Sequence, residues 1–196
     1  EETIDYIISL GIPICLIDRH FEHVNSSYVV TDNKESMGKA VSYLIELGYK
    51  NLAFIGYDSS LQHMKDREQG FLDATASIDS KVYKINFNKQ QAELGKNIQY
   101  ILKTQKADAI VFATNTLSIA GLKYLTQQGV QIPDDLNVMC FDSSEVYDFF
   151  YHPIIHVKQP IENLAKESVT ILTSQMKENT IQKKVLSSEL VAKTRV

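Results

Sequence analysis

The sequence predicts an α/β fold in which parallel β-sheets are flanked by helices. Short apolar, β-branched runs alternate with longer stretches of helical period along the whole chain. Strictly alternating strands and helices of this length form parallel sheets covered on both faces. The chain has 196 residues, of which 44% are hydrophobic, so it can bury a sizeable core, in one domain or two small lobes.

The predicted elements follow one another without a repeat, a low-complexity tract or a long linker. Strands are expected at residues 12–18, 28–31, 52–56, 81–87, 109–113, 136–141, 154–157 and 184–192. Helices are expected at residues 34–47, 61–76, 90–104, 117–128 and 160–177.

The first helix shows the signals on which these predictions rest. Its apolar side chains recur at helical spacing, at Met37, Ala40, Val41, Leu44 and Ile45. Asp32 stands where it can cap the helix start, and Gly48 ends it. The last helix opens on Pro160, in agreement with the preference for proline at the first helical position.

Charge and composition exclude several classes of protein. The net charge is −4, with no basic stripe, so this chain by itself is a poor candidate for DNA contact. No apolar run approaches the roughly 20 residues of a membrane span, and no signal peptide is visible. The chain opens on Glu1 without an initiating Met, and we expect its natural start to lie upstream.

The two cysteines, Cys15 and Cys140, each lie in a short apolar run. This position predicts two buried, reduced thiols on strands. No CxxC motif or Cys/His cluster accompanies them, and we expect neither a metal nor a cofactor.

Polar side chains follow the predicted strands, and ligands in parallel sheets bind outside the carboxyl ends of strands. Carboxylates and amides bind sugar hydroxyls, and an aromatic ring covers the apolar face of a sugar. The alternative is that each residue only caps the next helix. The residues concerned are Asp18, Arg19, Asp32, Asn33, Phe87, Asn88, Thr114, Asn115, Asp142, Ser143, Ser144 and Gln159.

Arg67 is the most informative single residue. It falls on the apolar stripe of the helix predicted at 61–76, between Met64 and Phe71. A guanidinium group cannot lose its charge, so an arginine on the buried side needs acceptors, from a carboxylate such as Asp142, from a ligand, or from both. The alternative is a side chain that reaches solvent and pairs with a neighbouring carboxylate of its own helix, Asp66 or Glu68.

Several motifs, in this order and spacing, resemble the LacI/GalR family of bacterial transcriptional regulators over nearly the whole chain. The matching segments are Val29–Asn33, Leu44–Gly56, Arg67-x-x-Gly70-Phe71, Asn115 with Gly121, Gly129–Leu136, Phe141-Asp142, Pro153 and Val157–Pro160. The resemblance implies a two-lobed core like that of periplasmic binding proteins, with the ligand between the lobes. It places residues 1–31 and 160–184 in an N-terminal lobe and residues 32–158 and 185–196 in a C-terminal lobe.

The resemblance also implies ligand contacts at Asp18, Arg67, Phe87, Asn115, Asp142 and Gln159, and His63 is predicted as a seventh contact from its position in the same helix. His63 precedes Arg67 by one helical turn and could equally be an ordinary surface histidine. Tyr83 or the following loop could take the place of Phe87. The family's DNA-binding headpiece and the first part of the N-terminal lobe have no counterpart here, so we expect that lobe to be incomplete and to expose a strand edge.

The function implied is that of the sensing core of a repressor, and no catalytic residue is expected. A sugar or sugar phosphate binds in the cleft and controls operator binding allosterically, in a cytoplasmic homodimer without membrane contact. Operator DNA is contacted only through the headpiece. The dimer surface is expected at helix 117–128 and at an aromatic run that could instead form an internal cluster, Tyr147, Phe149, Phe150 and Tyr151.

Two other classes of protein remain as alternatives. A transport-type periplasmic sugar-binding protein has the same fold and would carry a signal peptide upstream. An α/β enzyme is disfavoured, because the sequence has no GxGxxG, GxxxxGK[ST] or GxSxG motif and no metal cluster.

Overall fold

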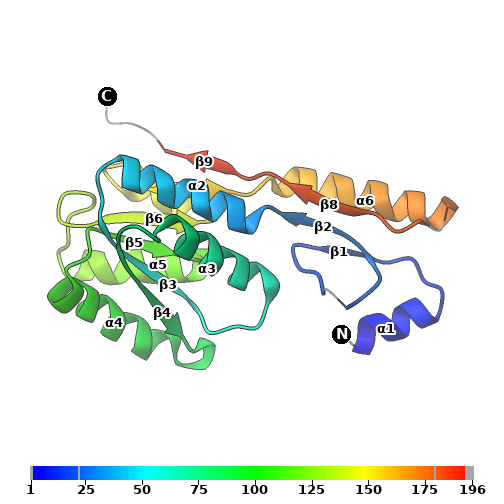
Figure 1. Cartoon of the computed structure of the whole chain (residues 1–196), viewed down its shortest axis with the longest axis horizontal. Coiled ribbons are helices and arrows are strands. Elements are labelled where there is room, and N and C mark those ends of the chain that lie inside the picture. The colour runs from blue at the N-terminus through cyan, green and yellow to red at the C-terminus, as the bar shows by residue number, and fades with distance from the viewer. Residues whose placement is uncertain (1, 22, 179, 193–196) are drawn as a thin grey trace.

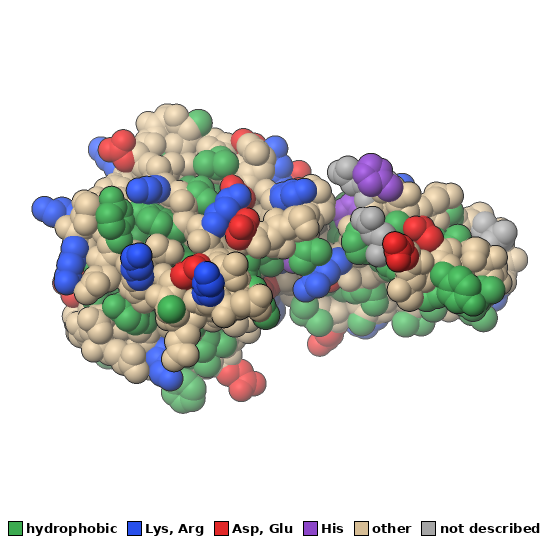
Figure 2. All heavy atoms as spheres, turned by 90° about the horizontal axis from the view of Figure 1, so that it is seen from below, with side chains coloured by type: hydrophobic (Ala, Val, Ile, Leu, Met, Phe, Trp, Pro, Cys, Tyr) green, Lys and Arg blue, Asp and Glu red, His purple; other side chains and the backbone are tan. Residues whose placement is uncertain are grey.

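The computed structural model describes residues 2–21, 23–178 and 180–192 of the chain. Within them the chain forms two bodies, each built on its own sheet (Figure 1). The larger sheet has six strands in the order β4-β3-β5-β6-β7-β9, and the smaller has three in the order β1-β2-β8. Figure 2 shows the smaller body joined to the larger one at a constriction. The predicted α/β fold with sheets flanked by helices is therefore confirmed.

Neighbouring strands run parallel in both sheets, except that β9 pairs antiparallel with β7. The strands are β1 (Cys15–Ile17), β2 (Ser27–Thr31), β3 (Asn51–Tyr57), β4 (Asp79–Ile85), β5 (Ala109–Phe112), β6 (Asn137–Phe141), β7 (Ile155–Lys158), β8 (Lys183–Leu186) and β9 (Glu189–Val191). The helices are α1 (Glu2–Ser9), α2 (Asn33–Glu46), α3 (Gln62–Ala74), α4 (Gln90–Tyr100), α5 (Asn115–Gln127) and α6 (Ile161–Glu178).

The six-stranded sheet separates two buried cores, because successive side chains of a strand point to opposite faces. On β3, Ala53 and Ile55 face the core under α4 and α5, whereas Leu52 and Phe54 face the core under α2 and α3. The strands in the middle of this sheet are buried throughout, which explains why they appear in the sequence as continuous apolar runs.

The three-stranded sheet is covered much more thinly. Helix α6 packs against β1 and β2, and the buried cluster consists of Val29, Leu164 and Ile171. Ile17 on the outer strand β1 and Val185 on the outer strand β8 are both exposed. A strand edge was expected in this part of the chain, and both outer strands of the small sheet, β1 and β8, carry an exposed apolar side chain.

Two features differ from the predictions. The strand predicted at 184–192 is two strands: β8 pairs with β2 in the small sheet, and β9 pairs with β7 in the large one. Residues 185 and 186, predicted in the C-terminal lobe, therefore belong to the small sheet. Helix α1 was not predicted, and none of its residues is buried.

The chain passes between the two sheets three times, after β2, after β7 and after β8. Side chains tie these crossings together. The Thr31 hydroxyl donates to Gln159 Oε1 at 2.9 Å, and the amide of Ser188 donates to Asp32 Oδ1 at 2.8 Å. Asp32 was predicted to cap α2, but its carboxylate makes no capping hydrogen bond and accepts from Ser36 instead.

Candidate functional site

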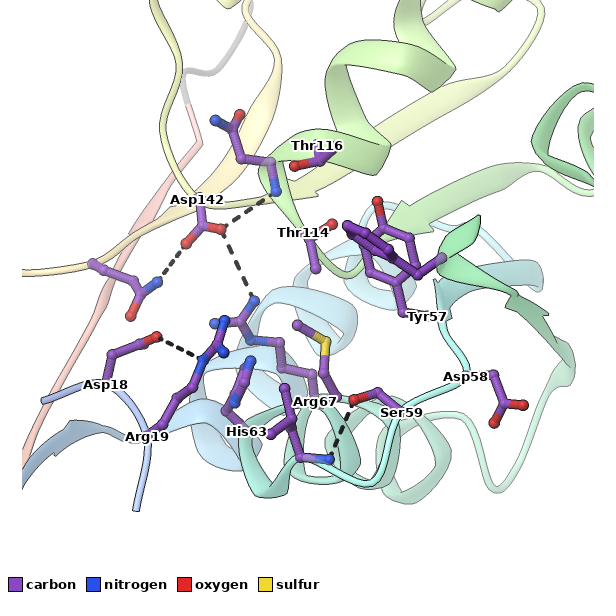
Figure 3. A pocket seen from close by; sticks show the side chains of 15 residues that line it. Asp18, Arg19, Tyr57, Asp58, Ser59, His63, Arg67, Thr114, Thr116 and Asp142 are labelled. Atoms are coloured by element: carbon purple, nitrogen blue, oxygen red, sulfur yellow. Dashed lines mark hydrogen bonds and ion pairs between the residues drawn. The ribbon is translucent and has the colours of Figure 1, made fainter. Parts of the chain in front are cut away.

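A cavity of about 530 Å³ lies at the carboxyl ends of the strands, with residues of both bodies in its wall (Figure 3). All seven residues predicted as ligand contacts line it. The full lining is Asp18, Arg19, Tyr57, Asp58, Ser59, Leu61, His63, Met64, Arg67, Phe87, Thr114, Asn115, Thr116, Asp142 and Gln159. Folding thus brings together side chains that are up to 141 residues apart in the sequence, from Asp18 to Gln159.

Arg67 lies in the wall with only 3% of its surface exposed. Its Nε donates to Asn33 Oδ1 and its Nη1 to the carbonyl oxygen of Ala113, both at 2.8 Å. The guanidinium carbon stands 3.7 Å from the centroid of the Phe141 ring. The predicted need for acceptors is met in this way, whereas Asp66 and Glu68 pair with Gln62 and Lys84 respectively.

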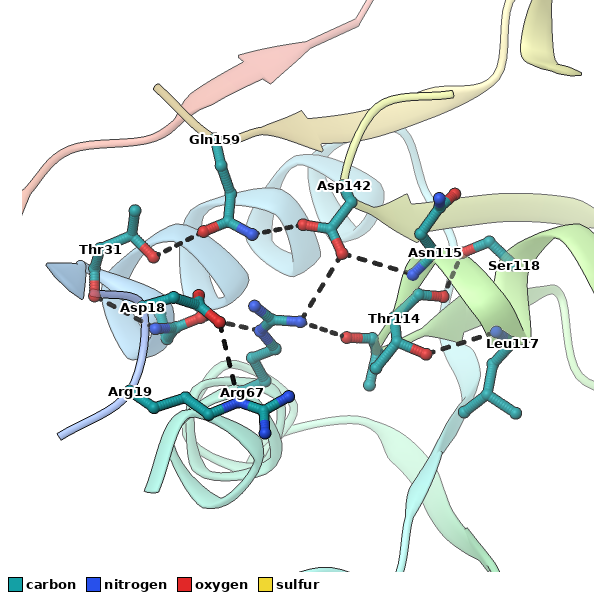
Figure 4. Close-up of polar contacts among 12 residues, drawn as sticks. Asp18, Arg19, Thr31, Arg67, Thr114, Asn115, Leu117, Ser118, Asp142 and Gln159 are labelled. Carbon is teal, nitrogen blue, oxygen red and sulfur yellow. Dashed lines mark hydrogen bonds and ion pairs between the residues drawn. The ribbon is translucent and has the colours of Figure 1, made fainter. Parts of the chain in front are cut away.

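Asp142 is the centre of a polar network in which α3, α5 and the crossing at Gln159 meet (Figure 4). Its Oδ1 accepts from Gln159 Nε2. Its Oδ2 accepts from the backbone amide of Asn115 at 3.3 Å and lies 3.9 Å from Arg67 Nη1. Both carboxylate oxygens are therefore occupied by groups of the protein.

Asp18 and Asp142 share an uncommon backbone conformation. Each directly follows a strand, and each has a positive φ, 65° at Asp18 and 77° at Asp142. Aspartate tolerates the left-handed region better than most residues, at a cost of about 1–2 kcal/mol. Strain at two carboxylates in one cavity wall is typical of positions whose side-chain direction matters for function.

His63 lies beside Arg67 on α3, and only 6% of its surface is exposed. The alternative that it is a surface histidine is therefore wrong. Burial, together with the charges of Arg67 and Arg19, lowers the pKa of the imidazole from 6.5 to about 4. The ring is neutral at neutral pH and, among the described residues, makes no hydrogen bond to the protein.

Two aromatic rings form an apolar part of the cavity wall. Phe87 is 70% exposed, and its ring centroid is 5.4 Å from that of Tyr57. Phe87 does not end a strand as predicted, because β4 ends at Ile85 and Phe87 begins a short 3-10 helix. The alternative residue, Tyr83, packs in the core under α4 and does not line the cavity.

At the start of α5, Thr114 caps the helix and the next residue, Asn115, offers a polar group to the cavity. Thr114 is the cap, since its hydroxyl accepts from the amide of Leu117 at 3.3 Å. Asn115 is the first residue of the helix, and its side-chain Oδ1 is buried without a hydrogen-bond partner. A buried polar atom without a partner is costly, so this oxygen is available to a donor from a ligand or water.

Some lining residues were missed at the sequence level. Tyr57 is the last residue of β3, and Asp58 follows β3 as directly as Asp142 follows β6, so the strand-end rule could have found them. Asn33 was noticed as a strand-end residue, but its role in holding Arg67 had no sequence signal. That role depends on the contact between α2 and α3, which are neighbours only in space.

The aromatic run after β6 is divided between the interior and the surface. Tyr147 is buried in the core and donates to the carbonyl oxygen of Asp142 at 3.2 Å, so it is not part of an exposed patch. Phe149 and Tyr151 are exposed, and Phe150 packs partly against the core.

Both cysteines lie on strands and are free thiols. Cys140 is fully buried, and burial raises the pKa of its thiol to about 12. Cys15 is only half-buried. Among the described residues no group of three His, Cys, Asp or Glu side chains is arranged to hold a metal ion. Nor does any described helix combine the length and apolarity needed to cross a membrane.

The fold and the cavity between its two sheets define the class of two-lobed α/β binding proteins. The chain belongs to the periplasmic binding protein-like domain family, whose model matches residues 41–194. This agrees with the resemblance to the effector-binding core of LacI/GalR regulators that the motifs indicated.

Curated relatives are regulators of transcription. The chain is 28% identical to the HTH-type transcriptional regulator DegA of Bacillus subtilis, covering 97% of this chain and 58% of that protein. It is 22% identical to the HTH-type transcriptional repressor PurR of Aliivibrio fischeri, covering 94% and 56% respectively. The chain thus spans little more than half the length of these relatives.

A similar solved structure is that of a LacI family transcriptional regulator from Enterococcus faecalis with bound ribose. It superposes with a TM-score of 0.86 at 18% identity, covering 97% of this chain and 71% of that one. At this identity the likeness supports the fold.

Proposed function

We propose that this chain is the effector-sensing core of a cytoplasmic, DNA-binding transcriptional repressor. A sugar or sugar-derived effector binds between two lobes and controls operator binding allosterically. The lobes are those predicted, residues 1–31 with 160–184 and residues 32–158 with 185–196, except that residues 185 and 186 move to the first lobe. The observation that carries the proposal is the convergence of the seven predicted contacts on one cavity between the two bodies. Relatives that are transcriptional regulators support a regulatory role for this chain, in preference to a role in transport or catalysis.

The mechanism follows from the position of the cavity. Asp18 belongs to the small body, Arg67, Asn115 and Asp142 belong to the large one, and Gln159 lies at a crossing. A ligand that contacts both sides binds one relative position of the bodies more tightly than another, and only that difference in affinity can drive a change. In a homodimer, which we also propose, the shift would alter the spacing of two DNA-binding headpieces and so the affinity for operator DNA.

A thermal-shift screen of sugars and sugar phosphates on the purified protein tests this function. A ligand at 100 times its dissociation constant stabilises the folded protein by about 2.7 kcal/mol, which is readily measured. Phe87→Ala should weaken binding of a stabilising ligand, because it removes a ring of the cavity wall. The variant should still fold, because the ring is exposed and its loss opens no core. Arg67→Ala should weaken binding more, because the charged wall of the cavity is lost.

Phe149→Ala is the matched control, since Phe149 is also exposed, at 87% against 70% for Phe87, but does not line the cavity. If a stabilising ligand binds the Phe87 and Arg67 variants as tightly as the parent protein, the proposed site is wrong. If no sugar or sugar phosphate stabilises the protein, the proposed sensing function is wrong.

A further inference from the structure

The two cationic side chains in the cavity wall each lie within ion-pair distance of a carboxylate of the protein. Arg67 has protein acceptors at Nε and Nη1, lies 3.9 Å from Asp142 Oδ2 and stacks on the ring of Phe141. Arg19 lies 3.9 Å from Asp18. Figure 3 shows both guanidinium groups on the side of the cavity where these carboxylates lie. Neither arginine is therefore a free cation for a ligand to find.

One of the helix amino ends in the cavity wall already holds a carboxylate. The amino end of α5 faces the cavity, and helix amino ends attract negative charge. The carboxylate of Asp142 occupies this end, because its Oδ2 accepts from the backbone amide of Asn115 at 3.3 Å. A ligand phosphate at this helix end would therefore meet a carboxylate.

The balance of charge in the lining is negative. It contains three carboxylates, of Asp18, Asp58 and Asp142, against the two guanidinium groups. His63 adds no charge at neutral pH, since its pKa is lowered to about 4 by burial and the two arginines. Further basic side chains, those of His20, His23 and Lys65, line a neighbouring hollow of about 250 Å³ and not this cavity.

Two neutral polar groups of the lining are open toward a ligand. Asn115 Oδ1 is buried without a partner, and the His63 ring has no hydrogen bond among the described residues. The rings of Phe87 and Tyr57 offer an apolar surface beside them. Hydroxyl groups of a ligand can hydrogen-bond to Asn115 and His63, and an apolar C–H face of the ligand can pack against the two rings.

We infer that the cavity selects an uncharged polyhydroxyl compound, a neutral sugar, and rejects the phosphorylated form of the same sugar. This inference rests on the proposed function and narrows it, because sugar phosphates are excluded as effectors. Its physical basis is that a phosphate group moved into the cavity loses its hydration and finds no uncompensated cation.

Matched pairs of probes test the inference by calorimetric titration of the purified protein. The pairs are ribose with ribose 5-phosphate, and glucose with glucose 6-phosphate, each at constant ionic strength. We expect the neutral member of any pair that binds to bind at least about tenfold more tightly. Equal or tighter binding of the phosphorylated member overturns the inference and leaves the sensing function standing. Absence of binding in every pair, and in a wider panel of neutral sugars, counts against the sensing function itself.

A charge variant tests the cause. Asp18→Asn removes the carboxylate beside Arg19 and keeps the shape of this cavity-lining side chain, so its effect is measured as the ratio of the two affinities. We expect it to narrow the ratio of neutral to phosphorylated affinity by about tenfold. Asp148→Asn is the control, because Asp148 is exposed, carries the same charge and does not line the cavity. An unchanged ratio in Asp18→Asn, or an equal change in both variants, overturns the role of the Asp18–Arg19 pair.

Discussion

The two bodies of the molecule differ most in how their sheets are covered. The six-stranded sheet has helices on both faces and two continuous cores, with Phe112 and Phe141 fully buried. The three-stranded sheet packs against α6, and its buried cluster among the described residues is Val29, Leu164 and Ile171. The cavity lies between them, and Arg67, His63 and Asp142 all come from the well-packed side. The difference indicates a rigid wall that holds the charged groups and a lightly held wall that can move against it.

The largest expected effect comes from opening the cores of the two bodies. Phe112→Ala should lower the free energy of unfolding by about 3–5 kcal/mol, because a fully buried ring is removed. Leu164→Ala should cost about 2 kcal/mol, because the thin small body can close over the gap. Urea unfolding measures both values.

Hydrogen exchange provides the control for the Phe112 and Leu164 variants. In Leu164→Ala the loss of protection should be confined to amides of β1, β2 and α6. An equal loss of protection across β3, β5 and β6 would show that the two bodies unfold as one cooperative unit.

The close approach of α2 and α3 gives the next largest effect. A Cβ on Gly70 would lie 2.3 Å from the carbonyl oxygen of Lys34, so Gly70→Ala must push the two helices apart. We expect a loss of about 1–3 kcal/mol in the free energy of unfolding, and weaker ligand binding because Asn33 on α2 would move from Arg67 on α3. Gly38→Ala on α2 is the control, since its nearest contact would be an ordinary 3.7 Å and alanine favours helix. A loss of similar size in both variants would refute the packing explanation.

His63 makes the stability of the cavity wall depend on pH. Its pKa is about 4 in the folded protein and 6.5 as the reference, so the unfolded chain binds more protons between these values. Stability should therefore fall as pH decreases from about 6.5 to 4, by at most about 1.4 kcal/mol per pH unit from this group. His63→Gln should flatten the dependence of the melting temperature on pH, whereas replacement of the exposed His23 by Gln should leave it in place. The same slope in His63→Gln would show that other groups cause it.

The smallest effect compares the two cysteines, one in each body. A thiol reagent at neutral pH should modify Cys15 at least about tenfold faster than Cys140, because Cys140 is fully buried with a thiol pKa near 12. Cys15→Ser should remove the fast phase, and mass spectrometry identifies the modified residue. Fast modification of Cys140 in the folded protein would mean that the large body opens readily.

Much of the fold was determined by local sequence patterns. The period of apolar residues placed nearly every strand and helix of the large body, because each of these elements buries a face that repeats regularly. The N-terminal α1 and the division of residues 183–191 into β8 and β9 escaped these patterns. α1 buries no residue, and β8 and β9 are short outer strands whose side chains are mostly exposed.

For the site, the sequence by itself placed Asp18, Asp142 and Gln159 directly after strands, though it misplaced Phe87, and it put Arg67 on a buried stripe. Only the tertiary structure decided what those residues do. Asn33 and the Ala113 carbonyl hold Arg67 from 34 and 46 residues away, and Asp142 joins α3, α5 and the crossing at Gln159. Hydrogen bonds and charge pairs depend on distances of a few ångströms in space, which no local pattern in the sequence records.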